Sequence, residues 1–189
     1  MGLTWTAVLV AVLAVAGWYL LFSATRLDRL HARVEGARSA LDAQLVRRAS
    51  VSLQLALSGL LDPATSLLVA DAAHVARDAA EPDRELAESH LTQALHAAMQ
   101  EPGVVEALED DPAGHELVAE LAAVSKRVEL ARRFHNDAVR AARVVRRKRV
   151  VRYLRLAGHA PWPPTFEMDD TPPRGLDRVD GSGTSTVVP

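Results

Sequence analysis

The stretch LVAELAAVSKRVELARRFHNDAVRAARVV, residues 117–145, predicts a long amphipathic helix. Positions three or four apart form a series that is apolar except at His135, and its members are Leu117, Leu121, Val124, Val128, Ala131, His135, Ala138, Ala142 and Val145. This period places the whole series on one face of a helix. Asp111-Pro112 precedes the stretch and Gly158 follows it, so the predicted helix covers about residues 114–157.

A second amphipathic series, nearer the N-terminus, predicts another long helix. Its apolar members, again three or four apart, are Leu27, Leu30, Val34, Ala37, Leu41 and Leu45. No proline occurs before Pro63, so one continuous helix is expected here, with Gly36 and Gly59 as its weak points.

Between the two series, proline and acidic residues divide the chain into shorter helices. Asp62-Pro63 predicts an N-cap followed by proline at the first helical position, in a helix that continues to about residue 80. A third helix opens at Glu81-Pro82 and ends at Pro102-Gly103, and a short helical turn follows over about residues 104–108. Because the chain is also rich in Ala and Leu, the predicted fold class is all-α.

Residues Leu3 to Phe22 form an uncharged and almost wholly apolar run. Twenty helical residues span roughly 30 Å, the thickness of the hydrocarbon core of a bilayer. Aromatic side chains that favour the membrane interface mark both ends of the run, at Trp5, Trp18 and Tyr19. The sequence therefore predicts a transmembrane anchor over residues 1–23 that crosses the cell membrane once.

Arginine residues follow this run, at Arg26, Arg29, Arg33 and Arg38, and none precedes it. Positive flanks stay on the cytoplasmic side, which predicts an N-terminus outside the cell and a cytoplasmic body. That body, residues 24–157, is expected to be an elongated antiparallel bundle of about four helices. Residues 158–189 are rich in proline, glycine and small polar residues, and they are predicted to be a disordered tail.

Charge is segregated along the body. Residues 62–120 hold two basic and fourteen acidic side chains, whereas residues 121–155 hold twelve basic and two acidic. The basic side chains at the end of the last helix are Arg140, Arg143, Arg146, Arg147, Lys148, Arg149, Arg152 and Arg155. An antiparallel bundle would bring this end back to the membrane, where it would contact anionic lipid headgroups. A solvated flank that neutralises the acidic helices explains the same charges equally well, and a nucleic-acid tether is a weaker third alternative.

Two stretches resemble motifs of the LemA family of membrane-anchored helical proteins. AQLVRR at residues 43–48, preceded by Asp42, resembles the family's D-x-Q-L-x-R-R segment. RVELARRFHNDAV at residues 127–139 is similar to R-I-x-x-A-R-x-x-Y-N-D-A-V, with His135 where the family usually has Tyr. The resemblance covers roughly residues 1–170 and implies a long antiparallel helical bundle behind one N-terminal membrane helix. It implies no biochemical activity.

The two motifs are expected to lie level with each other. Gln44 lies about 32 Å from the membrane end of the first helix, and Asn136 lies about 30 Å before the returning end of the last. We therefore predict a polar layer inside the bundle, and its members are Gln44, Arg47, Arg48, His135, Asn136 and Asp137. Such a layer would fix the register of the helices or, as the alternative, form a partner or ligand site.

No catalytic residues, metal site or cofactor are predicted. The serines lie in helical context without a nucleophile elbow, and the sequence has no phosphate-binding glycine loop. His115-Glu116 is not followed by the second histidine of a zinc-protease motif, and no calcium-binding loop occurs. One enzymatic alternative remains, a membrane-tethered enzyme of unrecognised class that uses Arg48, His135 and Asp137.

The sequence thus favours a membrane-anchored, non-enzymatic scaffold or interaction protein. Its expected partners are the membrane and proteins that the sequence does not identify. Ala7 and Ala11 form a weak small-residue face in the apolar run, which makes a homo-oligomer plausible.

Overall fold

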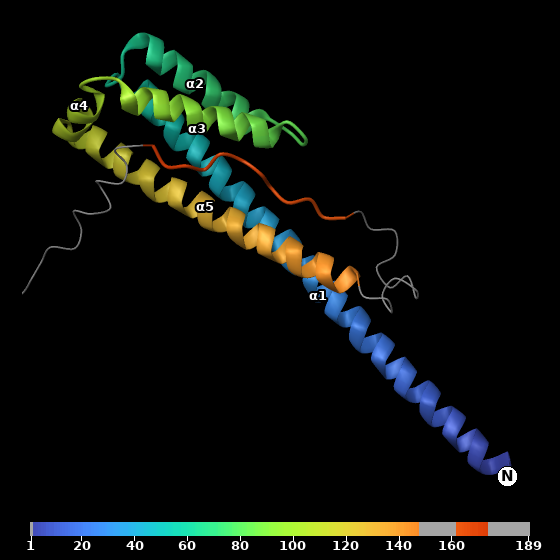
Figure 1. Ribbon diagram of the computed structural model, residues 1–189. Helices are drawn as coiled ribbons and strands as arrows, with labels where there is room; N and C mark the ends of the chain where they lie inside the picture. The colour runs from blue at the N-terminus through green and yellow to red at the C-terminus, as the bar shows by residue number, and fades with distance from the viewer. Residues whose placement is uncertain (1, 148–161, 174–189) are drawn as a thin grey trace, which may run out of the picture. The chain divides into compact units, whose positions relative to one another are not determined.

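The computed structural model describes residues 2–147 and 162–173, and all the regular structure among them is α-helical. The helices, shown in Figure 1, are α1 (Gly2–Leu57), α2 (Pro63–Asp78), α3 (Arg84–Gln100), α4 (Val104–Asp110) and α5 (Pro112–Arg146). For the described residues, the predicted all-α fold class is therefore confirmed.

The helix boundaries follow the local signals in the sequence. The Asp62 carboxylate caps α2 by accepting hydrogen bonds from the backbone N–H groups of Ala64 at 2.9 Å and Thr65 at 3.2 Å. Gly59 and Gly103 have φ values of +78° and +83°, a left-handed conformation that ends α1 and separates α3 from α4. α1 passes through Gly36 without a break, as the absence of proline predicted.

α5 begins two residues before the predicted start, because Asp111 accepts a hydrogen bond from the backbone N–H of Gly114 at 2.8 Å. Gly114 packs closely against α4: a Cβ atom at this position would lie 2.7 Å from the carbonyl oxygen of Leu108. The close approach of the first turn of α5 to α4 therefore requires glycine at this position. The predicted helical residues 148–157 lie outside the described part of the chain.

Two compact units divide the chain. We call Met1–Arg38 with Phe134–Thr165 the N-terminal unit, and Ser39–Arg133 with Phe166–Pro189 the central unit. The boundaries between them fall inside α1 and α5, and thus inside the bundle domain predicted over residues 24–157.

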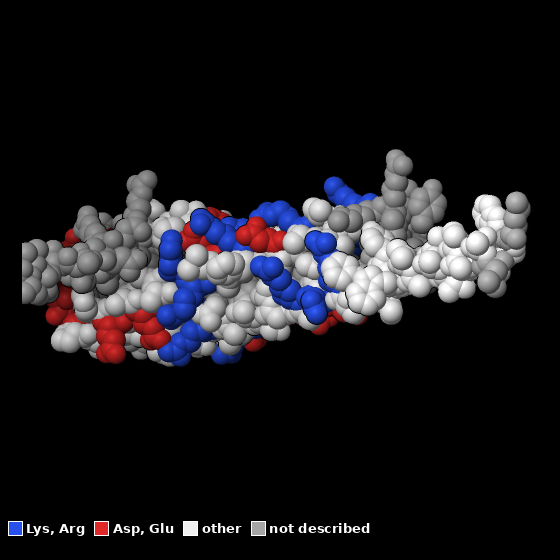
Figure 2. All heavy atoms as spheres, turned by 90° about the horizontal axis from the view of Figure 1, so that it is seen from below, with Lys and Arg blue, Asp and Glu red and all other residues white. Residues whose placement is uncertain are grey.

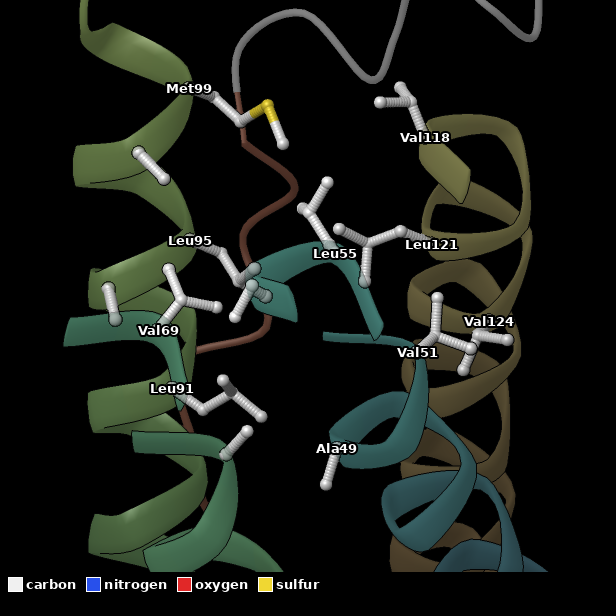
Figure 3. Close-up of a cluster of buried hydrophobic side chains, with 14 of the residues drawn as sticks. Ala49, Val51, Leu55, Val69, Leu91, Leu95, Met99, Val118, Leu121 and Val124 are labelled. Atoms are coloured by element: carbon white, nitrogen blue, oxygen red, sulfur yellow. The ribbon is translucent and has the colours of Figure 1, made fainter. Parts of the chain in front are cut away.

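The main hydrophobic core lies in the central unit and is built mostly from Ala, Val and Leu (Figure 3). It joins side chains of α1, α2, α3 and α5, and its fully buried members include Val51, Leu55, Val69, Leu91, Leu95, Leu121 and Val124. α2 and α3 lie side by side as a helical hairpin (Figure 1). This packing confirms a helical bundle.

Within the central unit, α1 and α5 run antiparallel. Leu41 and Leu45, early in this part of α1, cluster with Val128. Further along α1, Arg47 forms an ion pair with Glu120, which lies earlier in α5 than Val128. Within the central unit, the opposite order of the contacts along the two helices confirms the antiparallel arrangement that the short connections predicted.

The N-terminal unit has a small core and a large exposed apolar surface. Its core consists of Val34 on α1 with Ala138, Val139 and Ala142 on α5. The described side chains of α1 before residue 23 are almost all exposed, and the large apolar ones are Trp5, Val8, Leu9, Val10, Val12, Leu13, Val15, Trp18, Tyr19, Leu21 and Phe22. We call residues 2–22 the apolar end of α1.

Across residues 2–147 and 162–173, no helix meets the combined requirements of length and hydrophobicity for crossing a bilayer. The transmembrane anchor predicted over residues 1–23 is therefore not supported.

Residues 166–173, which we call the C-terminal segment, are extended and packed on the central unit (Figure 1). The prediction of a disordered tail over residues 158–189 is wrong for these residues. Composition suggested that the tail had too little apolar surface to bury, but Phe166 is 0% exposed and lies among Leu41, Leu45 and Val128. Residues 158–161 and 174–189 of the predicted tail lie outside the described part of the chain.

Candidate functional site

A buried ion pair between Arg48 and Glu88 is the most unusual polar feature of the central unit. Arg48 occupies a position on the buried face of α1, three residues after Leu45 and seven before Leu55. Glu88 lies on the buried face of α3, three residues before Leu91. Helical periodicity therefore turns both charged side chains into the core.

The two side chains make several hydrogen bonds. Arg48 Nη2 donates to Glu88 Oε2 at 2.6 Å and to the Glu88 carbonyl oxygen at 3.0 Å. Arg48 Nη1 donates to Thr92 Oγ1 at 3.1 Å, one turn further along α3. Since only 3% of the Arg48 side chain is exposed, this guanidinium depends on protein groups in place of water.

Further charges lie beside the pair. Arg84 Nη1 lies 3.8 Å from Asp42 Oδ1, and both residues act electrostatically on Glu88. Burial raises the pKa of the Glu88 carboxyl, an effect that the positive charges of Arg48 and Arg84 only partly oppose. Glu88 Oε1 and Arg48 Nε have no hydrogen-bond partner among the described residues. Desolvation therefore outweighs attraction at this carboxylate.

The C-terminal segment closes the site. Thr92 Oγ1, which accepts from Arg48, also lies 2.7 Å from the Asp169 carbonyl oxygen and donates toward it. The Asp169 backbone N–H donates to Ser89 Oγ at 3.1 Å. Hydrogen bonds from the backbone N–H and side chain of Thr171 hold the pKa of the Asp169 carboxyl below its usual value. The segment is thus linked to the ion pair through Thr92.

The predicted polar layer draws its residues from both units. In the central unit, Arg48 pairs with Glu88, Arg47 pairs with Glu120, and Gln44 is partly buried. These two glutamates were absent from the predicted layer.

In the N-terminal unit, the remaining members of the layer have different environments. His135 and Asn136 are buried, whereas Asp137 lies on the surface and its Oδ1 accepts a hydrogen bond from Arg140 Nη2 at 2.6 Å. The layer joining Gln44, Arg47 and Arg48 to these residues stays a prediction, and so does the enzymatic alternative built on it.

Four of the basic side chains predicted at the end of the last helix are described, and two of them contact residues 162–165. Arg143 donates to the Pro163 carbonyl oxygen from Nε at 3.1 Å and from Nη2 at 2.7 Å. The Arg146 guanidinium carbon lies 5.0 Å from the centroid of the Trp162 ring, a cation–π contact. Because Arg140 pairs with Asp137, only Arg147 of this group is exposed without a described partner. The other predicted basic residues, Lys148, Arg149, Arg152 and Arg155, lie outside the described part of the chain.

The aromatic residues predicted for a membrane interface are all exposed. Trp18 is 77% exposed, Trp5 similarly so, and Tyr19 about half. No Lys, Arg, Asp or Glu occurs between Gly2 and Thr25, and Figure 2 shows this part of the molecule without charged surface. Within residues 2–147 and 162–173, no group of three or more His, Asp or Glu side chains is placed to hold a metal ion.

Comparisons with protein-family models, with curated proteins and with solved structures yield no match for this chain. The resemblance to the LemA family therefore stays a prediction.

Proposed function

We propose that the protein is a non-enzymatic helical interaction protein that attaches to a lipid bilayer through the apolar end of α1. The observation that carries this proposal is the set of exposed apolar side chains on residues 2–22. A contiguous apolar surface of this extent is unfavourable in water and is typical of a membrane or protein interaction site.

The chemistry of the apolar end favours lipid as its main partner. It contains no charged residue, and it carries indole and phenol side chains at Trp5, Trp18 and Tyr19. These groups favour the boundary between headgroups and acyl chains. Each large apolar side chain removed from water contributes roughly 1.5–3 kcal/mol, so a few of them suffice for attachment. Attachment of this kind does not require the helix to cross the bilayer.

The bundle would then act as the part that meets other proteins. Among the described basic side chains at the end of α5, Arg140, Arg143 and Arg146 contact Asp137, Pro163 and Trp162 of the same chain. Because the apolar end contains no charged residue, attachment through it should depend only weakly on salt.

Replacing Val12 by Arg is expected to abolish attachment to vesicles. A charge placed in the apolar end costs about 2.5–3.5 kcal/mol on transfer to hydrocarbon, equivalent to roughly 100-fold weaker partitioning. The measurement is flotation of the full chain with zwitterionic vesicles in a density gradient.

The matched control for this experiment is Leu67→Arg on α2, because Leu67 is also a large apolar side chain and is 72% exposed. This variant should float like the wild-type protein. The proposal fails if the wild-type chain does not float, or if both arginine variants float equally well.

A further inference from the structure

The C-terminal segment lies on the central unit in the manner of a bound peptide. It is extended, forms no helix of its own, and contacts side chains of α1, α3 and α5. Only part of the segment is buried, notably Phe166 and Pro173, and Glu167 and Asp169 remain exposed.

One end of this surface is an apolar pocket for an aromatic ring. Leu41 and Leu45 on α1 and Val128 on α5 cluster with Phe166, and all four side chains are fully buried. Met168 and Ala131 pack beside them. A pocket of this kind takes a large apolar side chain and excludes water from around it.

The other end is a cationic position on α5. Arg132 Nε and Nη2 each lie 2.8 Å from Asp170 Oδ2, and Arg132 Nη1 lies 3.9 Å from Glu167 Oε2. Guanidinium groups bind carboxylates strongly because the hydrogen bonds are charge-assisted. This surface thus contacts an aromatic side chain at Phe166 and an acidic side chain four residues later, at Asp170.

Between these two positions, α3 binds the backbone of the segment. Ser89 accepts from the Asp169 N–H, Thr92 donates to the Asp169 carbonyl oxygen, and His96 Nε2 lies 2.9 Å from the Thr171 carbonyl oxygen. Backbone contacts provide affinity for an extended chain of any sequence, and the two side-chain positions provide the selectivity.

We infer that this surface of the central unit is a binding groove for an extended protein segment with an aromatic residue followed four positions later by a carboxylate. In this structure the chain's own C-terminal segment occupies the groove. The partner would be a protein carrying the same aromatic and acidic pattern, which would complement the Phe166 pocket and Arg132. The inference rests on the proposed interaction function, but it does not depend on lipid attachment.

The test uses a fluorescent synthetic peptide with the sequence of residues 165–173, titrated by anisotropy into the full chain in detergent solution. In the double variant Phe166→Ala/Asp170→Ala, the internal segment has lost both recognised side chains and should leave the groove. A tethered segment competes at an effective concentration in the millimolar range. We therefore expect the peptide to bind this variant roughly 100-fold more tightly than the wild-type protein.

Two controls locate the binding. Adding Arg132→Gln to the double variant should weaken binding of the peptide, and so should replacing the peptide's own Phe166 by Ala. If the double variant loses helicity by circular dichroism, Asp170→Ala alone replaces it, and binding between that of wild type and the open groove is expected.

Three results would overturn the inference. Equal binding to wild-type and variant chains would place the peptide elsewhere, and no binding to a folded variant would show that the groove does not take a peptide. Segment exchange between copies, seen by light scattering as a wild-type dimer that Phe166→Ala abolishes, would assign the groove to a second copy of the chain. Because detergent replaces the bilayer, none of these results depends on the outcome of vesicle flotation.

Discussion

Replacing Arg48 by Met alone is expected to lower the free energy of unfolding by about 3–5 kcal/mol at neutral pH. The substitution keeps an unbranched side chain of similar length but leaves the Glu88 carboxylate in the core without its counter-ion. Equilibrium unfolding in urea, followed by circular dichroism, measures the loss. A matched control is available one residue away, because Arg47 also pairs with a glutamate but is 52% exposed. Arg47→Met should cost no more than about 1 kcal/mol.

The double variant Arg48→Met/Glu88→Leu should recover most or all of this loss. An apolar pair of similar volume avoids the desolvation of two charges, and such replacements are often neutral or stabilising by roughly 1–4 kcal/mol. If Arg48→Met costs as little as Arg47→Met, the pair is not buried in solution. If the double variant is as unstable as the single one, the ion pair itself is a net source of stability.

The pH dependence of the Arg48→Met effect provides a second criterion. A carboxyl whose pKa is raised on folding stabilises the protein below its unfolded pKa, and this stabilisation is lost as the pH rises through the folded value. Without Arg48, the pKa of Glu88 should rise further, because its largest opposing influence is removed. The loss of unfolding free energy caused by Arg48→Met should therefore become smaller as the pH falls toward 4.5, the usual pKa of a glutamate side chain. A loss of unfolding free energy that becomes larger on acidification would contradict a raised pKa for Glu88.

Replacing Phe166 by Ala is expected to release the C-terminal segment while the bundle stays folded. Removing a fully buried phenyl ring costs about 3–5 kcal/mol, and here no helix depends on it for its own backbone hydrogen bonds. The loss should appear as local opening. Hydrogen exchange at the Asp169 and Thr171 amides, which donate to Ser89 and to the Asp169 side chain, should accelerate by about 100-fold or more.

The control for this substitution is Phe134→Ala, because Phe134 is 65% exposed. It should leave exchange at Asp169 and Thr171 unchanged, and the helical circular dichroism signal should be similar in both variants. Unchanged exchange at Asp169 in Phe166→Ala would show that Phe166 does not hold the segment.

The helices were predictable because their signals are local. Asp62-Pro63 predicts an N-cap followed by the first helical residue, and the structure has both at these positions. The apolar series also predicted two long amphipathic helices where the structure has α1 and α5. Such features depend on residues that are neighbours along the chain or along one helix face.

The partners of the polar residues were less predictable. The presence of Arg48 on an apolar helix face was visible in the sequence, and so was that of Glu88 between Ala87 and Leu91. Each position alone suggests a buried charge that needs a partner. Which two charges meet depends on how α3 packs against α1, and periodicity within each helix does not contain that information.

The C-terminal segment shows where composition misleads. Its prolines and carboxylates are typical of disordered chain, and averaged over the tail they outweigh one phenylalanine. The C-terminal segment is ordered because Phe166 packs against α1 and α5 and because Asp170 pairs with Arg132. These partners lie outside the tail, so the composition of the tail does not reveal them.

Attachment of the apolar end of α1 to lipid can be measured directly, because the chain contains no cysteine. Single cysteines replacing Val12 in the apolar end and Leu67 on α2, both exposed, would carry an environment-sensitive dye. With vesicles that contain quencher-labelled lipid acyl chains, we expect strong quenching and a blue-shifted emission at position 12 and neither at position 67. Equal, weak quenching at both positions would contradict attachment through residues 2–22.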